Sequence, residues 1–430
     1  MLSQLASRIE RVIPPQSRLR NVTMLAGSSV AAQAITILIA PISTRIYSPA
    51  DYGMATVFNT VLAVVAIVAS GRFELALPLP EDDESAVDVL LLGGITLLAT
   101  TVVSALALLV WGGQIAGLLH AAALAPYLWI LPIGVLGAGC YQLLNYWALR
   151  KKAYSCLART KLNQSITSAG VNVGVGMLYA GPLGLLLSNI LAQSAGIGTL
   201  ARVLRPHRAA LRHPSAARLR TALVNYRKFP LFSCGASLLN SMSNILPVFL
   251  LTAWYGVEVT GHFGLAQRLI SIPVQLVGGS VSQVFLGEVA HALREQPREV
   301  PVFFARVTKR MLKVSLLILV AGAAAQWLMP LIFGARWALA GQYAMFLTIF
   351  CAIQLVVSPV STIATLLKRQ DLQLLLDAIC AVVVFLLFYI PHCLQLTGTT
   401  VIAIYSIGNA LLYLMYYLVY KHLADGVTGE

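Results

Sequence analysis

Long apolar blocks separated by short polar segments dominate this chain. Each block is about 20 residues long, which is enough to cross the hydrocarbon core of a bilayer as a helix. The blocks predict twelve membrane spans. These are residues 22–46, 53–77, 87–111, 126–149, 162–179, 183–204, 229–255, 262–287, 311–333, 342–367, 372–390 and 398–420. The pattern therefore predicts an all-α polytopic membrane protein.

Basic residues gather in every second loop between these spans. The clusters lie at residues 8–20, 150–161, 202–228, 294–313, 368–369 and 421. This is the positive-inside pattern, which marks the cytoplasmic face of a membrane protein. With an even number of spans, both termini are expected on that face. The acidic run 81–84 interrupts the pattern, but acidic residues carry little topological weight.

Composition supports the same class of protein. The chain is 58% hydrophobic and 11% charged, whereas soluble domains carry about 25% charged residues. Its net charge of +14 does not indicate nucleic-acid binding, because the basic residues are spread over alternate loops instead of forming one surface. The six cysteines show no CxxC spacing, so neither a disulfide framework nor a zinc site is expected.

A basic connector at the middle of the chain suggests two bundles of six spans. We expect bundles at 22–204 and 229–420, a cytoplasmic linker at 205–228, an N-terminal cytoplasmic segment at 1–21 and a tail at 421–430. The first twenty residues contain no apolar core of a signal peptide. Leu2, Leu5 and Ile9 fall on one helical face, which predicts a short interfacial helix.

The two halves also resemble each other. Tyr47 is followed by Tyr52-Gly53-Met54-Ala55, and Tyr255 is followed by Phe263-Gly264-Leu265-Ala266. Six spans in each half would give both halves the same orientation. The expected relation is therefore a parallel repeat about an axis normal to the membrane.

Catalytic motifs are missing from the sequence. It contains no GxSxG, HExxH or Walker loop, and no GxGxxG between a strand and a helix. Without a soluble domain, a water-filled pocket could form only between the spans. This favours moving a substrate over transforming it, and no cofactor is expected.

Charged residues inside or beside the spans are candidates for function, because a charge in the bilayer is costly and usually faces a partner or a wet cavity. The first hairpin carries Arg45, Asp51, Arg72 and Glu74. They could line a polar path, or Arg45 and Glu74 could simply reach the headgroups on either side. Asp377 lies near the start of the eleventh span.

Two of the arginines are predicted to lack a partner in their own helix. Arg72 and Glu74 are two residues apart, so on a continuous helix their side chains would point about 200° apart. Arg268 lies about two turns into the eighth span, with no acidic neighbour in that helix. An unpaired arginine suits an anionic ligand, because its planar fork binds phosphate at two points.

Amide side chains are concentrated in the first, second, fourth, fifth, seventh and eighth spans. A single amide within a span usually forms a hydrogen bond between helices, but their concentration indicates a polar lining. Asn145, Asn240 and Gln267 are the amides expected to contact a substrate.

Four segments carry a family resemblance. They are TRIYSPADYG at 44–53, GRFELALPLPEDDE at 71–84, NYWALRKKAYSCLARTK at 145–161 and FGLAQRLISIPVQLVGGSVSQVFL at 263–286. In order and spacing, the chain resembles polysaccharide-repeat flippases of the O-antigen type. These belong to the multidrug/oligosaccharidyl-lipid/polysaccharide exporter superfamily.

The resemblance implies a MATE-like fold of two six-helix bundles related by a pseudo-two-fold axis. It implies alternating access that moves an undecaprenyl-diphosphate-linked oligosaccharide across the bacterial inner membrane for surface polysaccharide synthesis. Polymerase and chain-length proteins of the same pathway are implied partners. The cationic cavity would contain Arg45, Arg72 and Arg268 with the three amides.

Glu74, Asp51 and Asp377 are candidates for a gate or for coupling to protons or sodium ions. Two other functions stay open. A drug/cation antiporter of the same superfamily would be expected to have an acidic cavity. A membrane polymerase or glycosyltransferase would be expected to have a large outer loop or an acidic catalytic motif. Lipid II flippases usually have fourteen spans, against twelve here.

Overall fold

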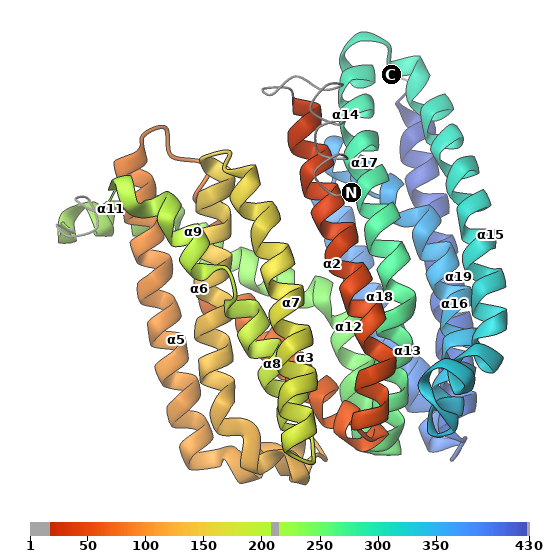
Figure 1. The fold of residues 1–430 in the computed structure, drawn as a ribbon. Helices are drawn as coiled ribbons and strands as arrows, with labels where there is room; N and C mark the ends of the chain where they lie inside the picture. Colours follow the sequence, from red (N-terminus) through yellow and green to blue (C-terminus); the bar gives the residue numbers. More distant parts are fainter. Residues whose placement is uncertain (1–17, 208–214, 428–430) are drawn as a thin grey trace, which may run out of the picture.

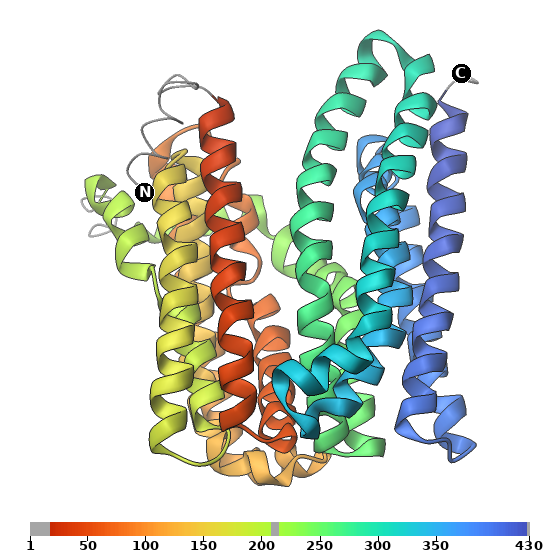
Figure 2. The same ribbon diagram turned by 45° about the vertical axis from the view of Figure 1, so that its right-hand side comes forward.

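The computed structural model describes residues 18–207 and 215–427, and these are helical almost throughout. The expected interfacial helix at the N-terminus and residues 208–214 of the expected linker lie outside the described residues. Two groups of helices stand side by side (Figures 1 and 2). They are joined through η2 (Arg205–His207), α11 (Ala216–Tyr226) and η3 (Phe229–Ser233).

The first group contains the helices that precede this connection. They are α2 (Arg18–Ile46), α3 (Pro49–Ala69), α4 (Phe73–Ala76), α5 (Asp83–Leu118), η1 (Ala122–Ile130), α6 (Leu131–Arg150), α7 (Tyr154–Leu178), α8 (Leu183–Ser194) and α9 (Ile197–Leu204).

The second group contains the helices that follow it. They are α12 (Cys234–Tyr255), α13 (Val257–Pro273), η4 (Val274–Gly278), α14 (Gly279–Glu295), η5 (Pro297–Glu299), α15 (Val300–Phe333), η6 (Ala335–Trp337), α16 (Ala338–Val360), α17 (Thr362–Leu366), α18 (Gln370–Cys393) and α19 (Gly398–Gly426).

Eleven helical segments of the described chain are long and apolar enough to cross a membrane. The predicted fifth span, which corresponds to α7, is not among them. This helix has 25 residues and packs between α2 and α8, so it has the length of a span but not the hydropathy. Its polar side chains, including Asn163, Gln164 and Asn172, are the reason.

The predicted second span is too long at its C-terminal end. We expected a helix to Leu77, but α3 ends at Ala69 and a separate short helix, α4, begins at Phe73. Gly71 and Arg72 have φ values of 60° and 58°, and this left-handed conformation ends a right-handed helix. The break changes the directions of all side chains that follow it.

The two groups meet in a tight seam between α3 and α13 at one end of the molecule. A Cβ atom on Gly53 would overlap the carbonyl oxygen of Val257, and one on Gly261 would overlap the carbonyl oxygen of Pro49. Only glycine allows two helix backbones to approach this closely. Near the seam, the Arg336 guanidinium and the Trp337 indole N–H both donate to the carbonyl oxygen of Thr44. We call this end, which is lowest in Figures 1 and 2, the closed end.

The seam also corrects the register of the predicted repeat. Gly53 contacts the first residue of α13, Val257, while Gly261 contacts the first residue of α3, Pro49. These reciprocal contacts pair Gly53 with Gly261. The sequence comparison paired Gly53 with Gly264, three residues too far along. The motif match was wrong because it counted an aromatic residue before glycine, whereas packing depends on where each helix begins.

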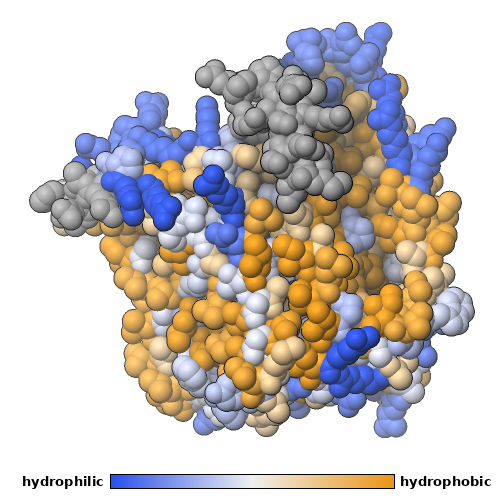
Figure 3. All heavy atoms as spheres, in the orientation of Figure 1, coloured by the Kyte–Doolittle hydropathy of each residue, from blue (hydrophilic) through white to orange (hydrophobic). Residues whose placement is uncertain are grey.

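Hydrophilic residues gather at the opposite end, and apolar residues cover the waist between the two ends (Figure 3). The acidic run lies at this end and is held by the next loop. The Arg150 guanidinium donates to the carbonyl oxygens of Leu77 and Pro80 at 3.2 and 2.6 Å, and both Arg150 and Lys151 pair with Asp83. Local pairing therefore offsets the charge of the acidic run.

Candidate functional site

A central cavity lies between the two groups of helices. It consists of three adjoining chambers of about 500, 510 and 30 Å³, and Arg268 lines all three. The first helical group contributes α2, α3, α7 and α8, and the second contributes α12, α13 and η4. Tyr52 lines its deep end, close to the seam, and Ser29 and Lys161 line the part farthest from the seam. The cavity therefore ends blindly toward the closed end.

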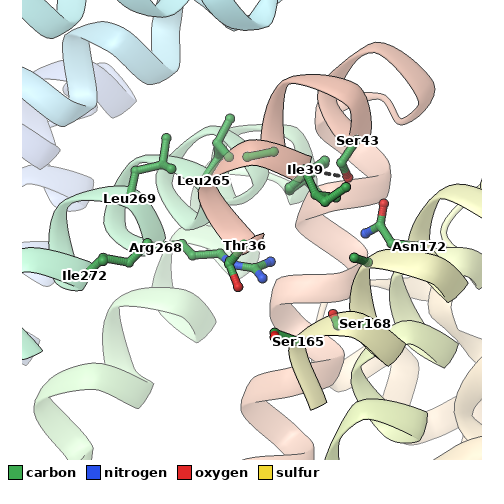
Figure 4. A pocket seen from close by; sticks show the side chains of 13 residues that line it. Thr36, Ile39, Ser43, Ser165, Ser168, Asn172, Leu265, Arg268, Leu269 and Ile272 are labelled. Carbon is green, nitrogen blue, oxygen red and sulfur yellow. Dashed lines mark hydrogen bonds between the residues drawn. The ribbon is translucent and has the colours of Figure 1, made fainter. Parts of the chain in front are cut away.

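Arg268 is the main positive charge of this cavity. It lies on α13 and is exposed. Figure 4 shows its guanidinium reaching toward Thr36 of α2 and toward α7, which carries Ser165 and Ser168. None of the ion pairs found among the described residues involves it. Apart from the backbone bonds of its helix, its only hydrogen bond found among the described residues is one that its backbone carbonyl accepts from Ser271, so the N–H donors of its guanidinium are available to a ligand.

A second cation, Lys161, lines the chamber of 510 Å³, and its ammonium group donates to the Ser29 hydroxyl at 2.7 Å. None of the described residues lining the three chambers is Asp or Glu. The other polar groups are amides and hydroxyls. They include Gln33, Asn59, Gln164, Asn189, Gln193, Asn244, Gln267, Ser271 and Gln275. The cavity can accept an anion with hydroxyl groups, and it offers no carboxylate to a cation.

A smaller pocket of about 310 Å³ lies between α4, α12 and α18, and we call it the inner pocket. Arg72 lines it from the first helical group, while Asn240 and Asp377 line it from the second. The Asn240 amide donates to the Asp377 carboxylate at 3.0 Å. The Arg72 Nε–H donates to the hydroxyl of Ser237 on α12 at 3.1 Å. Three predicted residues thus meet here, away from Arg268.

Glu74 is fully buried beside this pocket. Its carboxylate accepts hydrogen bonds from Ser70, from Gln142 at 3.1 Å and from Arg72 at 3.3 Å. The expectation that Arg72 and Glu74 could not pair was wrong. It assumed a continuous helix, and the left-handed backbone at Arg72 brings the two side chains to the same side.

Three other predicted residues lie outside both sites. Arg45 is exposed in the last turn of α2. Asp51 forms a capping box with Ser48 at the start of α3, in which its carboxylate accepts from the Ser48 backbone N–H at 2.9 Å. This is a common way to satisfy the free N–H groups of a helix end. Asn145 is half-buried on α6 and does not line the central cavity.

Sequence reasoning missed Lys161, Asn189 and Gln193 as cavity residues. Lys161 was counted with a basic loop, but it lies two turns inside α7. The signal that could have found it was the polarity of α7, whose run Lys161-Leu162-Asn163-Gln164-Ser165 is unusual for a span.

Comparison with known proteins identifies relatives of this chain. The profile of the family described as "Polysaccharide biosynthesis protein" matches residues 42–342. The succinoglycan biosynthesis transport protein ExoT of Rhizobium meliloti (strain 1021) is 25% identical over 329 residues, covering 75% of this chain. The aligned part spans 63% of that relative's length.

Several solved structures share the fold, two of which are the following. An inward-facing multidrug resistance MATE family transporter of the MOP superfamily superposes with a TM-score of 0.73 at 15% identity, covering 94% of this chain and 99% of the other. The lipid II flippase MurJ in an inward closed conformation gives 0.71 at 12% identity, covering 91% and 86%. At these identities the similarity concerns the fold alone.

Proposed function

The chain belongs to the family of polysaccharide biosynthesis proteins, and we propose from this premise that it flips a lipid-diphosphate-linked oligosaccharide across the bacterial inner membrane. It is a multi-pass membrane transporter with the MATE-like all-α fold that its sequence predicted. The proposed substrate is an undecaprenyl-diphosphate-linked repeat unit of a surface polysaccharide.

The observation that carries this proposal is the charge of the central cavity. It contains Arg268 and Lys161 and no carboxylate among its described lining residues. A diphosphate without neutralising partners cannot cross hydrocarbon, because the free-energy cost of transferring an ion from water into a medium of low dielectric constant is prohibitive. Two cations in a wet cavity offset that cost, and the amides and hydroxyls around them suit sugars. The lipid tail would stay in the bilayer.

The direction of access follows from the loops. The cavity is closed at the seam, and the described residues of the basic clusters lie toward the other end, which the positive-inside rule assigns to the cytoplasm. We therefore propose that this structure faces the cytoplasm, with both termini and the linker 205–228 on that side. The bundles 22–204 and 229–420 would rock relative to each other, so that the seam opens when the cytoplasmic side closes.

The inner pocket is our candidate for the cytoplasmic gate. Arg72 and Asp377 line it from opposite helical groups, so closure of this side would bring opposite charges together. Asp377 is also the candidate for coupling to protons or sodium ions. It lines the inner pocket and has one amide partner, whereas Glu74 and Asp51 each accept more than one hydrogen bond. Polymerase and chain-length proteins of the pathway remain proposed partners.

Flipping in reconstituted vesicles tests the function. The substrate is loaded on one leaflet, and its appearance on the other is followed with a membrane-impermeant reagent. Arg268→Ala should reduce the rate about 10- to 100-fold, since a hydrogen bond to a charged group contributes about 1.5–3 kcal/mol. Arg268→Lys should recover part of the rate, because it keeps the charge but loses the fork. Arg45→Ala, outside the cavity, is the matched control.

Wild-type activity on an organic cation instead of the lipid-linked oligosaccharide would favour the drug antiporter and overturn this proposal. An Arg268→Ala protein that flips normally would place the substrate path elsewhere.

A further inference from the structure

We infer that one wall of the central cavity is a glycan-binding surface made of three amides linked by hydrogen bonds, Asn59 on α3 and Asn189 and Gln193 on α8. We call these residues the amide chain. The inference rests on the proposed function and names the side chains that would bind the sugars, as distinct from the cations that would bind the diphosphate.

The three amides form a continuous hydrogen-bonded row. The Gln193 side-chain N–H donates to the Asn189 carbonyl oxygen at 3.0 Å, and the Asn189 side-chain N–H donates to the Asn59 carbonyl oxygen. Each amide fixes the orientation of the next. The amide chain therefore holds its free N–H and carbonyl groups in fixed directions before a ligand binds, which reduces the conformational entropy lost on binding.

The two ends of this row are open. Among the described residues, no partner is found for the Asn59 side-chain NH₂ or for the Gln193 side-chain carbonyl. Reversing all three amides would exchange these groups, so either direction leaves a donor at one end and an acceptor at the other. A sugar hydroxyl both donates and accepts, and neighbouring hydroxyls match such a row better than a phosphate does, because a phosphate can only accept.

The row lies where the first sugars of a bound substrate would be. Asn189 lines both large chambers, as do Arg268, Ser271 and Gln275 of the second helical group. Asn59 lines only the deeper chamber, and Gln193 only the other. A diphosphate held by Arg268 therefore leaves the attached sugars in chambers with the amide chain along one wall.

An independent observation in the smallest chamber also calls for a polar ligand. Asn172 of α7 is 7% exposed and lines this chamber, and its side-chain oxygen has no hydrogen-bond partner among the described residues. Figure 4 shows it on the same side of the chamber as Ser165 and Ser168. A buried polar atom without a partner is costly, and a water or a substrate hydroxyl in the chamber would satisfy it.

Two probes separate the sugar contribution from the diphosphate contribution. The purified full-length protein in nanodiscs is titrated with undecaprenyl diphosphate, and separately with undecaprenyl diphosphate carrying a repeat unit extracted from polymerase-deficient cells. The dissociation constant of the bare lipid divided by that of the glycan-carrying lipid measures how much affinity the sugars add. Asn189→Ala and Asn59→Ala should each reduce this ratio about 3- to 10-fold, as expected for one or two neutral hydrogen bonds, and leave the bare lipid unaffected. Asn145→Ala, an amide outside the cavity, should change neither constant.

Other results overturn the inference. An unchanged ratio in both variants would show that the sugars bind elsewhere. An equal loss for both probes, with a lower melting temperature, would show that the amides only hold α3 against α8. Arg268→Ala should weaken the binding of both probes. A wild-type protein that binds neither probe would contradict the proposed function itself. That result differs from an unchanged ratio, which contradicts only the role of the amide chain.

Discussion

At the scale of single residues, the partners of a charged side chain within a predicted span distinguish a structural role from availability to a ligand. The Glu74 carboxylate accepts hydrogen bonds from three side chains and has no exposed surface, whereas Arg268 has no acidic partner among the described residues and lines the cavity. Both looked equally unusual in the sequence. Burying a charge requires such partners, so the fully partnered residue stabilises the fold and the unpartnered one is available to a ligand.

Glu74→Gln tests this difference. Neutralising the carboxylate leaves Arg72, whose side chain is only 17% exposed, without its counter-charge. We expect a loss of about 1–3 kcal/mol in unfolding free energy, seen as a lower melting temperature in detergent. Arg268→Gln should leave the melting temperature unchanged. If Glu74→Gln melted normally but no longer responded to an imposed proton or sodium gradient in vesicles, Glu74 would be a coupling residue instead.

At the scale of helices, the contact between α3 and α13 decides which side of the cavity is closed. The contact depends on glycines at positions where a Cβ atom would meet the backbone of the facing helix. In ordinary helix packing, side chains separate the backbones, and interaxial distances are about 8–10 Å. A change at the seam should therefore alter the balance between conformations more than it alters the fold.

Gly261→Ala should favour opening of the closed end. Its Cβ atom would overlap the carbonyl oxygen of Pro49, and such overpacking costs about 1–3 kcal/mol. Spin labels on Ala180→Cys and Gln395→Cys, in loops of the two groups at this end, should report longer distances in a cysteine-free background. Gly170→Ala is the control, because no atom lies within 4 Å of its added Cβ. Unchanged distances would mean that the seam tolerates the methyl group.

At the scale of the whole molecule, alternating access requires the seam to separate in each cycle. Thr56 and Gly264 face each other across it, and a Cβ on Gly264 would lie 3.2 Å from that of Thr56. Cβ atoms joined by a disulfide are about 3.5–4.5 Å apart, so a small adjustment would allow a bond between the two helical groups.

The double variant Thr56→Cys/Gly264→Cys should therefore form a disulfide that stops flipping. We expect transport to fall to background after oxidation and to return with a reducing agent. In each single variant, neither treatment should change the transport rate. Mass spectrometry verifies the bond, and vesicle flipping measures the effect. Full activity of the oxidised protein would contradict a mechanism in which the seam opens.

The sequence alone determined the class and the broad fold of this protein. Runs of apolar residues must be helical to cross a bilayer, because hydrocarbon offers no partner for free backbone groups. Their lengths and the basic loops between them therefore predicted the helices, and four degenerate motifs predicted the family. Arg268 was also found from the sequence, because no acidic residue lies near it in its helix.

Only the tertiary structure decided which polar residues share a site. It separated Arg72, Asn240 and Asp377 from Arg268 and Gln267, left Arg45 at the end of a helix, and placed Asp51 in a capping box with Ser48. It also brought Lys161 and the amide chain into the cavity. Periodicity fixes the direction of a side chain relative to its own helix, but which helix it faces depends on crossing angles and on breaks such as the one at Gly71 and Arg72. These result from contacts between residues far apart in the chain.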